Sequence, residues 1–121
     1  MKFFEIIKDN IILADKAKLY ERFFFKARGL MFSMPLKKGK AIILEAEEEG
    51  ILSTTIHMLF VFFPIDVVWV NIEKKVVDIK KNVMPFTPWL CPKNPAKYVI
   101  ELPKNTIKHV KIGDALLFNE L

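Results

Sequence analysis

The sequence has one cysteine, no glutamine and only two arginines among its 19 basic residues. Because Cys91 is alone, the chain cannot form an internal disulfide, which is typical of a protein from a reducing compartment. Charged residues interrupt the first ten positions before a signal-peptide hydrophobic segment could reach working length. We therefore expect a cytoplasmic protein.

The sequence also lacks an apolar run long enough to cross a membrane. Its longest candidate, Ile56–Val70, falls short of the roughly 20 residues that a membrane-spanning helix needs, and it contains Pro64 and Asp66. This segment is predicted to be protein core, and no membrane partner is expected. The carboxylate of Asp66 then needs a buried partner or marks a site, because an unpaired buried charge is very costly.

Conventional catalytic and ligand-binding motifs are absent. There is no phosphate-binding loop, dinucleotide fingerprint or serine elbow. His57 and His109 have no partners at metal-ligand spacing, and Cys91 has no adjacent base. We expect no metal and no cofactor, and these absences favour a non-enzymatic protein over an enzyme.

The basic residues are almost all lysine, and the formal net charge is +5. A composition rich in Lys and Glu is typical of heat-adapted proteins. Nucleic-acid sites usually rely on Arg for contacts to bases, so this composition gives little support for a nucleic-acid partner. That alternative stays open, and it requires a basic face built from lysines such as Lys37, Lys38, Lys40, Lys80 and Lys81.

The N-terminal part is expected to form a hairpin followed by a helix. Phe3–Lys8 and Ile11–Ala14 have the composition of two short strands. Asp15 can cap a helix whose apolar positions, from Leu19 to Met31, recur at helical spacing, and Gly29 suits its end.

The remaining chain is mostly strand-like, with a second short helical turn expected at residues 105–110. The predicted strands are Ala41–Glu47, Thr54–Phe63, Ile65–Asn71, Val76–Lys80, Lys97–Leu102 and Ala115–Asn119. Four prolines in Met84–Pro95 exclude a central strand and predict a rigid surface loop. We expect one domain over residues 1–121. Its predicted class is α+β and predominantly β, a curled antiparallel sheet or small barrel with one main helix.

Three stretches together resemble a known family. They are Arg28–Met31, then His57–Met58 with Phe63–Val68, and finally Pro95–Pro103 followed by Ile112–Asp114. In order and spacing they resemble the domain of unknown function 192 family, in the form seen in archaeal members. The resemblance implies a small, single-domain, β-rich protein without an established activity.

The chain departs from that family at two places. Many bacterial members have Trp-Met-Lys-Asn-Thr where His57–Val61 reads His-Met-Leu-Phe-Val, so apolar groups replace polar ones. Asn105 stands near the position of the family's usual glycine after the Glu-Leu-Pro motif. Asn tolerates a left-handed turn better than other non-glycine residues, so we expect one there.

Two carboxylates are candidate functional groups. Arg28 is the preferred partner of Asp66, because its guanidinium offers a fork to a carboxylate. That pair is either a structural tie or an anion-recognising or acid–base pair in a cleft. Glu101 is either exposed beside Lys97 or turned inward beside Asp66, where the two could serve as an acid–base pair.

Met58 and Trp89 are the candidate contact residues. Met offers an adaptable apolar surface, and Trp89 lies on a loop already stiffened by proline, which lowers the ordering cost of binding. Alternatively, Trp89 folds back as a lid. The leading hypothesis is a binding or accessory module for a small polar ligand, with a site at Arg28, Met58, Asp66, Trp89 and Glu101. The alternatives are an acid–base enzyme using Asp66 and Glu101, and a lysine-mediated nucleic-acid binder.

Overall fold

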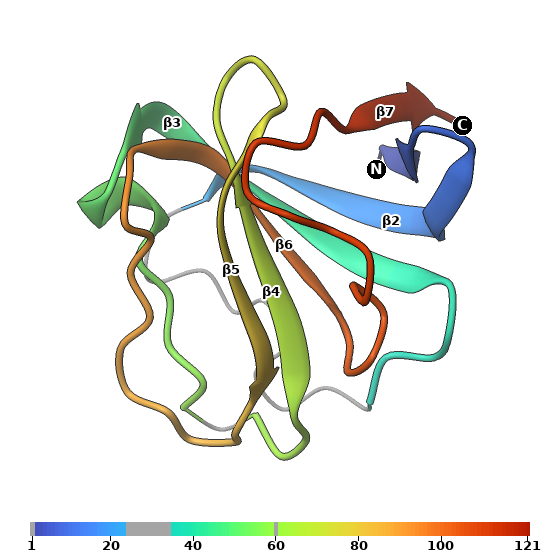
Figure 1. Cartoon of the computed structure of the whole chain (residues 1–121). Coiled ribbons are helices and arrows are strands. Elements are labelled where there is room, and N and C mark those ends of the chain that lie inside the picture. Colours follow the sequence, from blue (N-terminus) through green and yellow to red (C-terminus); the bar gives the residue numbers. More distant parts are fainter. Residues whose placement is uncertain (1, 24–34, 60) are drawn as a thin grey trace.

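The described part of the chain forms one curled sheet of seven strands (Figure 1). The computed structural model describes residues 2–23, 35–59 and 61–121. The strands are β1 (Phe3–Lys8), β2 (Ile11–Phe23), β3 (Lys40–Gly50), β4 (Ile65–Val70), β5 (Val76–Val83), β6 (Ala96–Pro103) and β7 (Leu117–Glu120). Their order across the sheet is β5-β4-β6-β3-β2-β1-β7.

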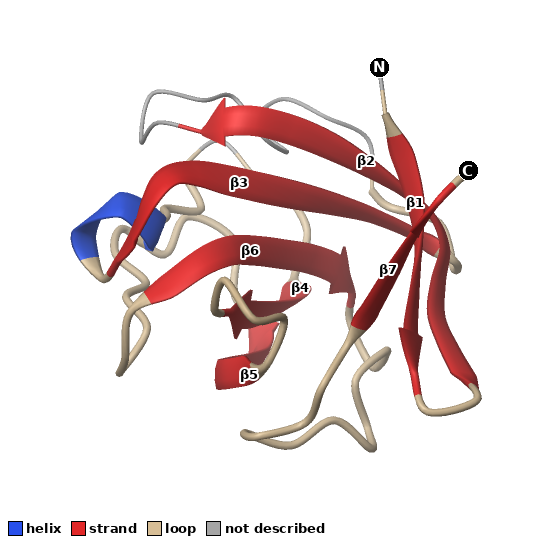
Figure 2. Cartoon of the chain, turned by 90° about the horizontal axis from the view of Figure 1, so that it is seen from above, coloured by secondary structure: helices blue, strands red, loops and turns tan. Residues whose placement is uncertain are grey.

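Neighbouring strands are antiparallel except for β2 and β3, which run parallel. The strands turn progressively across the sheet, so that β1 and β7 stand across the ends of β3 and β6 (Figure 2). The two termini lie close together, and the amide of Leu121 donates to the carbonyl of Phe3 at 2.9 Å. The result is a half-barrel.

The first part of β5 is bonded to the segment that precedes β7. The amide of Val76 donates to the carbonyl of Asp114, and the amide of Leu116 donates to the carbonyl of Lys74, both at 2.8 Å. These bonds bring the two ends of the sheet together at one corner, so the curl is nearly closed there.

The sheet carries a hydrophobic core on each face, and β4 is buried on both. One core includes Ile42, Val67, Trp69 and Val99 from the strands, and the segments at residues 56–63 and 90 cover it. The other lies inside the curl, where the loop after β6 contributes Ile107 and Val110. Burial on both faces explains why Ile65–Val70 is apolar at every position except Asp66, because such a strand has no polar side.

The expected α+β class is wrong, because the main helix predicted from Asp15 is a strand over its described part. Residues 15–23 belong to β2, and residues 24–34 lie outside the described residues. Leu19 packs against the core inside the curl, whereas Tyr20 packs against the other core. A strand with apolar residues on both faces loses its alternation and imitates helical spacing. No helix within the described ranges is long and apolar enough to span a membrane.

Two further predicted elements differ from the structure. The described residues of the segment, 54–59 and 61–63, form no strand. A 3-10 turn, η1 (Leu52–Thr54), leads into an irregular segment that makes an isolated bridge between Ile56 and Leu90. Its apolar side chains cover the sheet, which explains why it resembles a strand in sequence. The helical turn expected at residues 105–110 is also absent. The left-handed conformation expected at Asn105 is confirmed by its φ of 68°.

Trp69 links this covering segment to the sheet. Its side chain is fully buried, and its Nε1 donates to the carbonyl of Thr54 at 2.8 Å. We predict that Trp69→Phe lowers the free energy of unfolding by about 2 kcal/mol, because it leaves a buried carbonyl without its donor and opens a small cavity. Denaturant titration measures the change. Trp89→Phe is the matched control and should leave stability unchanged; equal effects of the two variants would contradict the assignment.

Candidate functional site

An apolar pocket of about 460 Å³ lies beside Trp89. Its lining residues are Leu52, Thr55, Ile56, His57, Leu59, Pro88 and Trp89. Two of them are exposed to an unusual degree for their type, since Leu52 is 87% exposed and Trp89 is 73% exposed. The volume lies within the range of small-molecule sites, which are concave and mostly apolar with a few polar groups.

The walls of the pocket are fixed by backbone hydrogen bonds between two segments far apart in sequence. Ile56 and Leu90 exchange amide–carbonyl bonds of 2.9 Å in both directions. The amide of Met58 donates to the carbonyl of Thr87 at 2.7 Å, and the amide of Phe86 donates to the carbonyl of Met58 at 2.8 Å. Together with the prolines, these bonds preorganise the pocket and reduce the cost of ordering it on binding.

His57 is a polar group in the lining of this pocket. Its Nδ1 accepts a hydrogen bond from the amide of Leu59 at 3.1 Å. A ring nitrogen that accepts carries no proton, so in the neutral imidazole the proton is on Nε2. The mostly apolar lining therefore offers the Nε2 proton of His57 as a donor, together with the indole N–H of Trp89. The hydroxyl of Thr55, also in the lining, donates to the carbonyl of Ile51 at 2.9 Å.

Of the two predicted contact residues, Trp89 lines the pocket and Met58 does not. The side chain of Met58 is fully buried in the core, and its backbone bonds to Thr87 and Phe86 hold the Pro-rich loop. Sequence reasoning missed Leu52 and Leu59, and among functional roles it considered His57 only as a possible metal ligand. Leu52 lies in a turn that no periodic pattern marks, and only the bridge between Ile56 and Leu90 brings these residues to Trp89.

The carboxylate of Asp66 is 1% exposed and is bound by backbone amides. Its Oδ1 accepts from Asn82 at 2.9 Å, and its Oδ2 accepts from Thr106 at 3.0 Å and from Ile107 at 3.4 Å. Asp66 thus joins β4 to the end of β5 and to the loop after β6. Arg28, its predicted partner, lies outside the described residues.

Glu101 is buried on the opposite face of the sheet from Asp66. It stands between Ile42 of β3 and Val67 of β4, whereas Asp66 stands opposite Leu102. Directly paired residues share a face and successive residues alternate, so the structure does not bring the two carboxylates together. Oε1 of Glu101 has no hydrogen-bond partner within the described part of the chain. Desolvation by burial raises the pKa of Glu101 to about 7.

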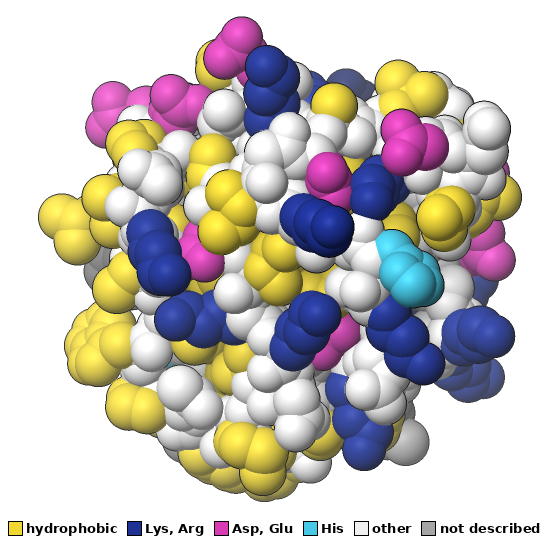
Figure 3. All heavy atoms as spheres, viewed as in Figure 1, with side chains coloured by type: hydrophobic (Ala, Val, Ile, Leu, Met, Phe, Trp, Pro, Cys, Tyr) yellow, Lys and Arg dark blue, Asp and Glu magenta, His cyan; other side chains and the backbone are white. Residues whose placement is uncertain are grey.

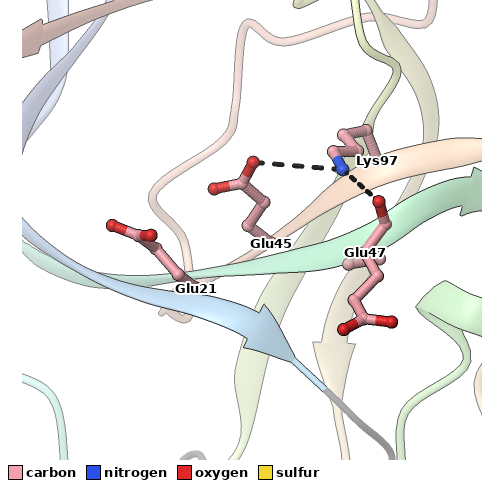
Figure 4. A pocket seen from close by; sticks show the side chains of 5 residues that line it. Glu21, Glu45, Glu47 and Lys97 are labelled. Carbon is pink, nitrogen blue, oxygen red and sulfur yellow. Dashed lines mark hydrogen bonds and ion pairs between the residues drawn. The ribbon is translucent and has the colours of Figure 1, made fainter.

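Two polar hollows lie along β2, β3 and β6, and both contain charges that are already paired. The first, of about 490 Å³, is lined by Glu21, Glu45, Ala46, Glu47 and Lys97. Figure 4 shows Lys97 between Glu45 and Glu47: its Nζ is 4.0 Å from Glu45 Oε2 and donates to the carbonyl of Glu47 at 2.8 Å.

The adjoining hollow, of about 380 Å³, shares Glu21 and Glu45 with the first. Lys74 Nζ lies 4.6 Å from the ring centroid of Tyr98 and donates to its hydroxyl at 3.1 Å. Glu21 pairs with Lys2 at 3.6 Å. Across the two hollows three glutamates are balanced by three lysines, Lys2, Lys74 and Lys97, so little net charge is left for a ligand. No cluster of three or more His, Cys, Asp or Glu side chains that could hold a metal occurs in the described ranges.

Comparison with known sequences gives a single family. The DUF192 profile, described as an uncharacterized ACR, matches residues 6–118. A UPF0127 protein of Pyrococcus abyssi is 37% identical over 103 residues, which cover 82% of both chains. A UPF0127 protein of Thermococcus sibiricus is 34% identical over 105 residues, which cover 84% of this chain and 64% of the relative. The chain therefore spans less than two thirds of the length of that relative.

Comparison with solved structures supports the fold. A protein of unknown function from Novosphingobium aromaticivorans superposes with a TM-score of 0.82 at 20% identity. The superposition covers 95% of this chain and 83% of the other. The half-barrel is therefore shared with a distant bacterial protein.

The three backbone amides that donate to the Asp66 carboxylate lead to a prediction about stability. Asp66→Asn replaces one acceptor oxygen by an amino group that faces backbone N–H groups, so the free energy of unfolding should fall by about 3 kcal/mol. Denaturant titration measures it. Asp15→Asn is the control, because the Asp15 side chain is 64% exposed and its ion pair with Lys40 spans 3.8 Å. A change at Asp66 as small as the change at Asp15 would refute the structural role.

The raised pKa of Glu101 leads to a prediction about how the stability of the fold depends on pH. Its pKa is about 7 in the fold against an ordinary value of 4.5, so between these values the folded state holds a proton that the unfolded state has lost. The free energy of unfolding should therefore fall by about 3 kcal/mol as pH rises from 4.5 to 7. Glu101→Gln should remove this component.

Thermal unfolding at pH 4 and pH 8 tests the prediction. The Glu101→Gln variant should match the wild type at pH 4 and be more stable at pH 8. Glu48→Gln, at an exposed position, is the matched control and should follow the wild type at both pH values. If the Glu101→Gln variant showed the wild-type pH dependence, ionisation of Glu101 would not be what lowers the stability of the fold, and the prediction would be wrong.

Proposed function

We propose that this chain, which belongs to the DUF192 family, is a ligand-binding domain whose pocket beside Trp89 takes a small molecule with a flat apolar body. One observation carries the proposal. A preorganised apolar pocket keeps Trp89 and Leu52 largely exposed, although burying them would be favourable. Exposed apolar groups gathered in one concave site are typical of a binding site.

The lining also limits the chemistry of the ligand. Trp89 offers an aromatic face, and Leu52, Leu59 and Pro88 offer aliphatic contacts, so the body of the ligand is an aromatic or compact hydrocarbon group. The Nε2 proton of His57 is a donor and requires an acceptor such as a carboxylate or sulfonate oxygen. The ligand is therefore amphipathic, rather than the purely polar molecule expected from the sequence.

An acid–base enzyme that uses Asp66 and Glu101 together finds no support in this geometry. The two carboxylates lie on opposite faces of the sheet, and neither lines the pocket beside Trp89. Binding, rather than acid–base chemistry by this pair, is the function that the geometry favours.

The proposal is tested with 8-anilinonaphthalene-1-sulfonate, which combines an aromatic body with an anionic acceptor. The native protein should bind one equivalent saturably, with enhanced dye fluorescence and quenching of Trp emission. Trp89→Ala should weaken binding about tenfold, because losing one large aromatic contact costs about 1.4 kcal/mol. His57→Phe should weaken binding less, because it removes only one donor.

Ile72→Ala is the matched control, since Ile72 is 58% exposed but lies at the turn between β4 and β5, outside the pocket. Binding by this variant should equal that of the wild type. Dye binding that is unsaturable, or that falls equally in the Trp89 and Ile72 variants, would overturn the proposal. Circular dichroism spectra would verify that each variant is folded.

A further inference from the structure

Residues 79–113 have a strongly one-sided charge. They contain seven lysines and a single acidic residue, Glu101, which is buried in the sheet. The lysines at positions 80, 81, 104, 108 and 111 are exposed. Lys and Arg side chains gather on the lower half of the face in Figure 3, whereas most acidic side chains on that face lie in the upper half.

Asp66 brings two of these lysine-bearing segments together. Its carboxylate binds the amide of Asn82, next to Lys81, and the amide of Thr106, two residues from both Lys104 and Lys108. The buried carboxylate of Asp66 therefore holds the end of β5 and the loop after β6 next to each other. The lysines beside them form one surface, defined here as the basic face: Lys81, Lys104, Lys108 and Lys111. Lys80 pairs with Val67 and therefore lies on the other face of the sheet.

The loop that carries most of the basic face is also anchored at its far end. Lys8 Nζ donates to the carbonyl of His109 and lies 3.2 Å from Asp114 Oδ2. An anchored loop presents its charges in a fixed arrangement, so a partner does not have to order it.

A hollow of about 740 Å³ extends the basic face toward the turn before β3. Lys104 lines one side and Lys38 the other. The acidic residue in its lining is Asp15, whose carboxylate is 3.8 Å from Lys40 Nζ. The lining therefore has a net positive charge, with two lysines against one aspartate that is itself paired with Lys40.

We propose that the basic face binds the phosphate backbone of duplex nucleic acid. Clustered ammonium groups that outnumber the carboxylates near them, Asp15 and Asp114, suit a regular array of phosphates. Phosphate contacts supply affinity without reading sequence. Single-strand sites rely on aromatic rings that stack on bases, and the basic face as defined has none. This inference is independent of the pocket beside Trp89, because the two surfaces share no residue.

Fluorescence anisotropy with a labelled 20-base-pair DNA duplex and a matched RNA duplex tests the proposal. The triple variant Lys81→Gln, Lys104→Gln and Lys108→Gln should bind about tenfold more weakly, or worse, in 50 mM salt. The slope of log affinity against log salt should fall by about one for each phosphate that the variant no longer neutralises. The DNA and RNA arms show which duplex is preferred.

The control variant, Lys2→Gln, Lys16→Gln and Lys75→Gln, has the same net charge but changes exposed lysines outside the basic face. It should retain wild-type affinity within about threefold. Equal losses in both variants would show that only net charge matters and would overturn the proposal. So would the absence of duplex binding by the wild type in 50 mM salt, or tighter binding to phosphatidylglycerol vesicles than to either duplex.

Discussion

The carboxylate of Asp66 is the group on which the arrangement of the surface depends. It accepts three backbone amides from two segments that the sheet alone does not join, the end of β5 and the loop after β6. A buried carboxylate is tolerated where donors surround it, and here backbone donors do so. Without it, the loop after β6 would lose its attachment to the centre of the sheet, and Ile107 would lose its position in the core.

Much of the sheet is predictable from the sequence, because turn residues clearly bound most of its strands. The opening hairpin, the strands over β3 to β6 and the Pro-rich loop follow from local patterns, and Asn105 takes the expected left-handed turn. The error over β2 arises because Leu19 and Tyr20 pack on opposite faces. Single-sequence periodicity cannot separate such a strand from a helix, nor can it separate an apolar covering segment such as residues 54–63 from a strand.

The candidate site was only partly predictable, for a different reason. Trp89 was a candidate because a large aromatic ring on a proline-rich surface loop is typical of a contact residue. Asp66 was a candidate because its carboxylate interrupts an apolar run. The position of Glu101 depends on how the strands pair. The register between β4 and β6 places Glu101 opposite Val67, so its side chain lies on the other face of the sheet from Asp66. Register depends on the partner strand as well as on the strand itself, so two carboxylates that look equivalent in sequence have unlike environments.

The position of β5 at the end of the sheet has a consequence for self-association. Its first residues are bonded to the segment before β7, but Lys80, Lys81 and Asn82 have no strand beside them on the outer side among the described residues. An open edge invites a second chain to add a strand, and lysines or an irregular backbone there oppose this. Both features are present, since Asn82 has a φ of 50°. The same lysines that make the surface cationic thus help to keep concentrated protein from aggregating edge to edge.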